Sequence, residues 1–190
     1  MVSTSSAQRP HLKETSFQID PLGLAPIPDD TRQRFLRFKL LGENRTLLAL
    51  KNIAEIHQLS ISDILPVPEI SSSMLGICNW RGEILWLADL NALVGNSSLW
   101  HQAPFLEQPI AIVVQSAQKK LGLVVERVDD IERIEPQSIQ QNTDLCPPLW
   151  APYVAGYIAE NPGIVLDVAA IVASCFQEHH NLPLFSTTPV

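Results

Sequence analysis

The chain has 190 residues, of which 46% are hydrophobic, so it can bury a substantial core without a framework of disulfides. With 20 acidic and 13 basic residues its net charge is −7, which argues against a nucleic-acid-binding protein because such proteins need surplus positive charge to displace counterions from phosphates. The three cysteines include no CxxC pair, and no window approaches the roughly 20 apolar residues of a membrane span. We therefore expect a cytoplasmic protein with no signal peptide and no membrane segment.

The beginning of the chain predicts a flexible leader followed by a strand. Residues 1–33 are rich in Ser, Pro and charged side chains, which disfavours a packed structure, and residues 178–190 are likewise predicted to form a flexible tail. RFLRFKL (34–40) alternates apolar and basic residues, as a half-buried strand does. A turn leads from it into TLLALKNIAEIHQL (46–59), which is predicted to complete a hairpin and to continue as one strand.

The second half of the chain repeats this order of elements. IAIVVQ (110–115) takes the place of the opening strand, and a turn and a second apolar run follow it. A shift of 75 residues aligns Ile53 with Val128 and Ile56 with Ile131. Each half then places a glycine before another turn and strand, which indicates an internal duplication.

Two aspartates extend the duplication and define the predicted fold. Asp89 and Asp167 each follow an apolar run and precede a short Ala-containing stretch, where a carboxylate caps a helix by accepting its first amide N–H groups. Short antiparallel strands can remove their exposed edges by curling into a barrel. We therefore predict a mainly β fold of two pseudo-equivalent five-stranded barrels with short helices. The domain is expected to span 34–177, with the two barrel subdomains, at about 34–105 and 106–177, packed side by side.

Motifs for catalysis and cofactor binding are missing from the sequence. It contains no GxGxxG, Walker, GxSxG or HExxH motif, and its histidines and cysteines lack the short spacing of metal ligands. We predict no enzyme activity, no cofactor and no metal site. Five acidic residues interleave with apolar ones and are predicted to form a solvated strand face: Glu126, Asp129, Asp130, Glu132 and Glu135.

The segment NWRG is the candidate for a contact with a partner. Here a predicted turn displays Trp80 and Arg81 side by side, and these residue types are enriched at the centres of protein interfaces. The alternative is that Trp80 belongs to the core and Arg81 forms a surface charge or an internal ion pair. The residues alone leave both interpretations open.

GICNWRGEILWLADLNALVG (76–95) closely resembles the G-x-x-N-L-R-G-x-x-x-P-V-x-D-L signature of CheW-like domains. RFLRFKL, NIAEI, LGLVVERVDDI and YVAGYI resemble further segments of that family in the same order, so the resemblance covers about 34–175. The segment NWRGEILW is similar to the variants of this signature found in cyanobacterial phototaxis and pilus-motility systems. The resemblance implies two intertwined SH3-like barrels that act as a non-catalytic adaptor. Its expected partners are the regulatory domain of a CheA-type histidine kinase and the cytoplasmic tip of a methyl-accepting chemoreceptor.

In the family, the receptor tip lies against a groove between the barrels. The resemblance assigns the receptor or kinase interface to nine positions: Ile53, Gly76, Asn79, Trp80, Arg81, Gly82, Val128, Ile131 and Gly156. Three positions depart from the family pattern, since Trp80 replaces Leu, Trp86 replaces Pro and Glu126 replaces Asp. We expect these changes to alter the choice of partner more than the fold.

Two alternative functions stay open. One is a CheW-like module of another kinase pathway, or a CheV-like protein without its receiver domain. The other is a small-molecule-binding β-barrel, which would need an apolar cavity between the halves.

Overall fold

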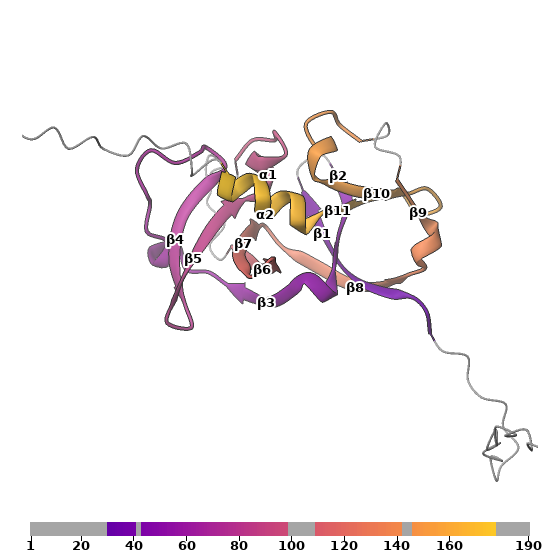
Figure 1. Ribbon diagram of the computed structural model, residues 1–190, viewed down its shortest axis with the longest axis horizontal. Helices are drawn as coiled ribbons and strands as arrows, with labels where there is room; N and C mark the ends of the chain where they lie inside the picture. Colours follow the sequence, from indigo (N-terminus) through magenta and orange to yellow (C-terminus); the bar gives the residue numbers. More distant parts are fainter. Residues whose placement is uncertain (1–29, 41–42, 99–108, 142–145, 178–190) are drawn as a thin grey trace, which may run out of the picture. The chain divides into compact units, whose positions relative to one another are not determined.

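The computed structural model describes residues 30–40, 43–98, 109–141 and 146–177 (Figure 1). Thr31–Val190 form one compact unit, and all the described helices and strands belong to it. The predicted tail and all but the last four residues of the predicted leader lie outside the described residues. The first strand begins at Gln33, next to the predicted start of the domain.

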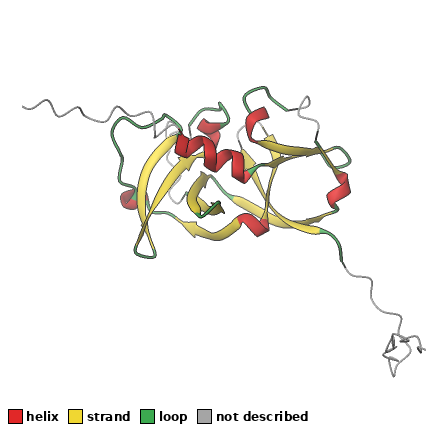
Figure 2. Ribbon diagram, viewed as in Figure 1, coloured by secondary structure: helices red, strands yellow, loops and turns green. Residues whose placement is uncertain are grey.

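Two β-sheets dominate the described residues, which confirms the predicted mainly β class (Figure 2). In hydrogen-bonded order, the six-stranded sheet contains β8 (Val128–Ile134), β1 (Gln33–Leu40), β2 (Glu43–Ala49), β11 (Gly163–Leu166), β10 (Val154–Ile158) and β9 (Ile139–Gln140). The five-stranded sheet contains β3 (Ile53–Gln58), β6 (Ile110–Ser116), β7 (Lys119–Val125), β5 (Glu83–Asp89) and β4 (Met74–Trp80). Neighbouring strands are antiparallel except for the parallel pairs β2 with β11 and β5 with β7. In the part of the chain that is described, both sheets are open, because their end strands are not hydrogen-bonded to each other.

The strand order shows the internal repeat. The order β3-β6-β7-β5-β4 in one sheet corresponds to β8-β1-β2-β11-β10 in the other, and Ile53 and Val128 are the first residues of β3 and β8. Strands β1 and β2 pair with β8 and β11, whereas β6 and β7 pair with β3 and β5. Each sheet therefore combines strands from both halves of the chain, and the halves cannot separate without breaking both sheets.

The segment between β1 and β4 contains a break that contradicts the predicted continuous strand. β2 ends at Ala49, a 3-10 turn occupies Leu50–Asn52, and β3 begins at Ile53 in the other sheet. The break was missed because this turn contains no glycine or proline, the usual markers of an interruption. The chain crosses from one sheet to the other at this turn.

Both predicted helix caps are confirmed. Asp89 precedes α1 (Leu90–Leu93), and its Oδ1 accepts hydrogen bonds from the backbone N–H groups two and three residues further on, at 2.9 and 3.2 Å. Asp167 precedes α2 (Val168–Gln177) and accepts the equivalent bonds at 2.8 and 3.1 Å. Each cap satisfies amide groups that the helix leaves unpaired and typically contributes about 1 kcal/mol.

The buried side chains form three clusters because successive residues of a strand point to opposite faces of its sheet. In β6, Ile112 and Val114 belong to a central core built from both sheets and α2. Ala111 and Val113 of the same strand belong to a second cluster, on the other face of the five-stranded sheet. A third cluster occupies the corresponding face of the six-stranded sheet. Since the second and third clusters are buried mainly by strands of one sheet each, both sheets must curl around them.

Candidate functional site

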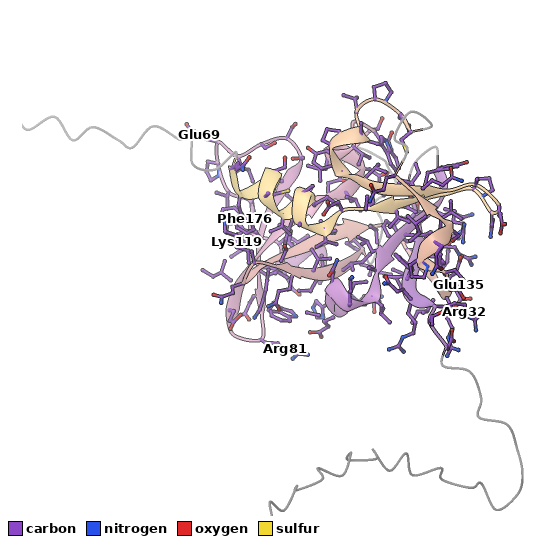
Figure 3. The ribbon with its side chains drawn as sticks, turned by 45° about the vertical axis from the view of Figure 1, so that its right-hand side comes forward. Arg32, Glu69, Arg81, Lys119, Glu135 and Phe176 are labelled. Atoms are coloured by element: carbon purple, nitrogen blue, oxygen red, sulfur yellow. The ribbon has the colours of Figure 1, made fainter. Side chains whose placement is uncertain are left out.

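The NWRG segment forms the tip of the β4–β5 hairpin. Trp80 pairs with Glu83, so Arg81 and Gly82 make a two-residue turn, and their φ angles of 53° and 82° are the left-handed values that a type I′ turn requires. The Asn79 Oδ1 accepts a hydrogen bond from the Gly82 N–H at 3.0 Å and thereby holds the turn closed. Figure 3 shows Arg81 at this tip, where 69% of its side chain is exposed.

Beneath the tip, Trp80 is anchored and Arg81 is displayed. Trp80 is 7% exposed, and its Nε1 donates a hydrogen bond to Glu55 Oε2 at 2.8 Å. The Arg81 Nη2 lies 2.9 Å from the same oxygen, while its guanidinium and the Lys120 ammonium lie 5.2 and 4.7 Å from the centre of the Trp80 ring. The alternative interpretation is therefore confirmed for Trp80, whereas the role of Arg81 in an interface stays a prediction. Trp80 belongs to the core, and Arg81 forms an ion pair but leaves most of its surface open to solvent.

This contact also ties the five-stranded sheet together. Glu55 lies on β3 and Trp80 on β4, the two end strands of that sheet. The side chains thus bridge strands that backbone hydrogen bonds do not join. No local sequence pattern marks Glu55, because its partners lie 25 and 26 residues further along the chain.

The two glycines assigned to the interface have equivalent structural positions. Gly76 is buried, and a Cβ there would lie 2.2 Å from the carbonyl oxygen of Leu65. Gly156 is also buried, and its Cβ would lie 2.8 Å from the carbonyl oxygen of Gln140. In both halves the glycine allows another segment of backbone to approach the strand closely, so neither residue presents a side chain to a partner.

On the end strands β3 and β8, apolar side chains extend from the core to the solvent-exposed surface. Ile56 on β3 pairs with Ile112, and Ile131 on β8 pairs with Leu36. Directly paired residues point to the same face of a sheet. Ile112 and Leu36 belong to the central core, whereas Ile56 and Ile131 are 42% and 49% exposed. The two exposed isoleucines therefore continue the central core outward.

Ile53 and Val128 lie one step deeper on the same two strands. They pair with Val114 and Phe38, both in the central core, and both are half-buried against it. In Figure 1, the equivalent strands β3 and β8 lie in the lower half of the domain. We call Ile53, Ile56, Val128 and Ile131 the aliphatic rim. Ile56 was noted in the sequence repeat but was not among the predicted interface residues.

The predicted solvated acidic face of β8 is wrong at two positions. Glu132 accepts hydrogen bonds from Arg37 Nη1 and Arg45 Nε, each at 3.1 Å, and Asp129 Oδ1 lies 3.3 Å from Arg127 Nε. Hydrogen bonding to Arg45, assisted by the charges of both arginines and opposed by burial, lowers the pKa of Glu132 from its usual value. These carboxylates hold arginines in place and are less than one-fifth exposed.

The described residues form no metal site, and the pKa of Cys78 is shifted in the direction that makes a thiol less reactive. Within the described ranges, no group of three or more His, Cys, Asp or Glu side chains could hold a metal ion, and no helix is both long and apolar enough to span a membrane. Cys78, Cys146 and Cys175 are buried and form no disulfide with one another. Burial, followed by the charge of Asp63, raises the pKa of the Cys78 thiol, which makes it a poor nucleophile.

These features describe a small, strand-exchanged β domain that offers a contact surface. The family model of the CheW-like domain matches residues 34–176. The chain therefore belongs to the CheW-like domain family, and the predicted class of non-enzymatic adaptor agrees with this membership.

Three individual proteins illustrate the relationship. The chemotaxis protein CheW of Rhizobium meliloti (strain 1021) is 28% identical over 94 residues, which are 50% of this chain and 58% of that protein. A probable chemotaxis protein CheW of Rhizobium etli is 26% identical over 119 residues, covering 63% and 73%. The crystal structure of the scaffolding protein TtCheW from Thermoanaerobacter tengcongensis matches with a TM-score of 0.61 and 21% identity, over 73% of this chain and 90% of that chain. The chain thus spans little more than half of the first relative, and the structural match concerns the fold.

Proposed function

We propose that this domain is a non-catalytic cytoplasmic scaffold that couples a CheA-type histidine kinase to the cytoplasmic tip of a methyl-accepting chemoreceptor. The observation that carries the proposal is the pair of exposed isoleucines, Ile56 and Ile131, at equivalent places on β3 and β8. Membership of the CheW-like family supports the choice of partners. A phototaxis or pilus-motility setting stays a prediction from the wording of the NWRG segment.

The aliphatic rim suits an amphipathic helix of the receptor tip. Such a helix presents apolar residues at intervals of three and four and docks them into an apolar groove. On this domain, two aliphatic rows emerge from one core, so a helix lying across them would extend an already packed interior. The alternative of a small-molecule-binding barrel gains no support here, because the central core fills the region between the sheets with side chains.

Ile131→Asn is expected to weaken binding to a purified receptor-tip fragment by about 1–3 kcal/mol, because an exposed anchor of an interface is lost. Leu149→Asn is the matched control, since Leu149 is 65% exposed but lies just before the 3-10 turn Ala151–Tyr153, outside both the aliphatic rim and the NWRG turn. Isothermal titration calorimetry on both variants, with melting curves to check the fold, makes the comparison. Equal losses of affinity in the two variants, or no loss in Ile131→Asn, would show that the aliphatic rim is not part of the receptor-binding site.

Arg81→Ala tests the hairpin tip separately. We expect it to weaken receptor binding by about 1–3 kcal/mol. It should lower stability by less than about 1 kcal/mol, because the ion pair with Glu55 is largely solvent-exposed on the Arg81 side.

Glu55→Gln separates a direct contact from an effect through the ion pair. The glutamine oxygen can still accept the Trp80 N–H, whereas the charge that faces Arg81 is removed. If Arg81 touches the receptor, Glu55→Gln keeps its affinity. Should both variants lose affinity equally, Arg81 acts only by holding Glu55 and is not a contact residue.

A further inference from the structure

We propose a second binding site, at one end of the six-stranded sheet, that accepts an acidic peptide segment of a protein partner. It is a pocket of about 470 Å³ between the end of β1, the start of β2, the start of β8 and the β10–β11 turn. Its lining residues are Arg37, Lys39, Arg45, Arg127, Asp129, Asn161 and Pro162. The site shares no residue with the aliphatic rim or with the NWRG turn.

The charge of the pocket is opposite to that of the chain. Four of the lining side chains are cationic, and the carboxylates among them and beneath them are Asp129 and Glu132. These described side chains leave an excess of two positive charges in a chain of net charge −7. A concave surface lined by charges of one sign attracts ligands of the opposite charge. The pocket should therefore raise the local concentration of an anionic ligand.

Several of these cations have donors to spare. Lys39 is exposed and forms no ion pair or hydrogen bond with the residues that the structure describes. Arg127 is 56% exposed and pairs only with Asp129 within the described ranges. The Arg37 Nε lies 3.7 Å from Asp129 Oδ2, beyond hydrogen-bonding distance. A carboxylate entering the pocket would therefore find free N–H groups on exposed Lys39 and Arg127.

Other contacts fix the wall of the pocket in advance. Arg45 is 10% exposed, donates to Glu132, and donates from Nη1 to the carbonyl oxygen of Asn161 on the β10–β11 turn. This arrangement ties three elements of the six-stranded sheet together. A pre-formed wall reduces the entropy that is lost when a ligand binds.

The internal repeat relates this pocket to the NWRG turn. The β10–β11 turn corresponds to the β4–β5 turn, and a shift of 75 residues aligns Arg45 with Lys120, which lies over the Trp80 ring. The two equivalent ends have thus diverged, one towards an aromatic tip and the other towards a cationic pocket. The volume lies within the usual range for ligand pockets, roughly 300–1,000 Å³, which a lone inorganic anion would leave mostly empty. A short stretch of acidic peptide fits better.

Fluorescence anisotropy with the full chain tests the assignment. The probe is a labelled, glutamate-rich peptide with blocked ends, and the control probe has glutamine in place of glutamate. The variant Lys39→Gln/Arg127→Gln removes two exposed pocket cations and leaves Arg45 intact. The charge-matched control, Arg34→Gln/Lys51→Gln, removes two exposed cations that do not line the pocket.

We expect the pocket variant to bind the glutamate peptide roughly tenfold more weakly and the charge-matched control to stay within about twofold of the parent. Melting temperatures should be similar in all three proteins. Equal weakening in both variants would show that only the net charge of the protein matters. Binding of the glutamine peptide would show that the ligand need not be an anion. Binding of inorganic phosphate without any binding of the peptide would assign the pocket to a free oxyanion. Each of these three results overturns the proposal.

Discussion

Gly76→Ala is expected to lower the free energy of unfolding by about 4 kcal/mol or more, which places it among the largest single-residue effects. The added Cβ would lie 2.2 Å from the carbonyl oxygen of Leu65 and 2.9 Å from its carbon. That oxygen accepts a hydrogen bond from the Ile77 N–H at 2.9 Å, so moving it away would break the bridge between the two segments. The φ of +134° at Gly76 adds strain for any residue with a side chain.

Gly82→Ala provides the matched control for this variant. Gly82 also has a positive φ, of +82°, but a Cβ there meets nothing within 4 Å. We expect only the left-handed backbone penalty, about 1–2 kcal/mol. Urea unfolding followed by tryptophan fluorescence gives both values. A small and equal loss in the two variants would mean that the Leu65 segment moves aside freely, contrary to the bridge in the structure.

Local features of the fold were predictable from the sequence, and the family resemblance implied intertwined barrels, whereas the pairing of particular strands required the structure. Alternation in RFLRFKL predicts a strand, and the positions of Asp89 and Asp167 predict two caps, because each depends on residues close together in the chain. Which strands pair depends on contacts between distant segments, such as Leu36 with Ile131. The two halves carry similar rows of apolar residues, so a strand could pair within its own half or with the equivalent strand of the other half. The repeat alone does not decide between these pairings.

The candidate site shows the same division. The turn at Arg81 and Gly82 follows from local chemistry, because glycine favours a left-handed position in a short hairpin. The ion pair with Glu55 depends on how the five-stranded sheet curls, which no local pattern reports. The burial of Gly76 likewise depends on the approach of another segment of backbone.

Glu132→Ala is expected to lower the free energy of unfolding by roughly 2–4 kcal/mol, between the values for exposed and for buried ion pairs. Glu132 binds Arg37 and Arg45, whose side chains are 35% and 10% exposed. Its removal leaves the Arg45 guanidinium nearly buried, with the Asn161 carbonyl as its one remaining partner among the described residues. Asp130→Asn is the control, because Asp130 is exposed on the same strand and has no ion pair with the described residues.

The pH dependence of stability tests whether the ion pairs of Glu132 cause this loss of stability. The pKa of Glu132 in the folded chain is below its ordinary value of 4.5, so its charged form is the one that folding favours. Its contribution to the free energy of unfolding is therefore complete above about pH 4.5, and it is lost as the pH falls through the lower pKa of Glu132 in the folded chain. The difference in unfolding free energy between the parent and Glu132→Gln should be constant from about pH 6 to 8 and shrink below about pH 4.5. A difference that does not change with pH would show that packing, and not the charge of Glu132, accounts for the loss.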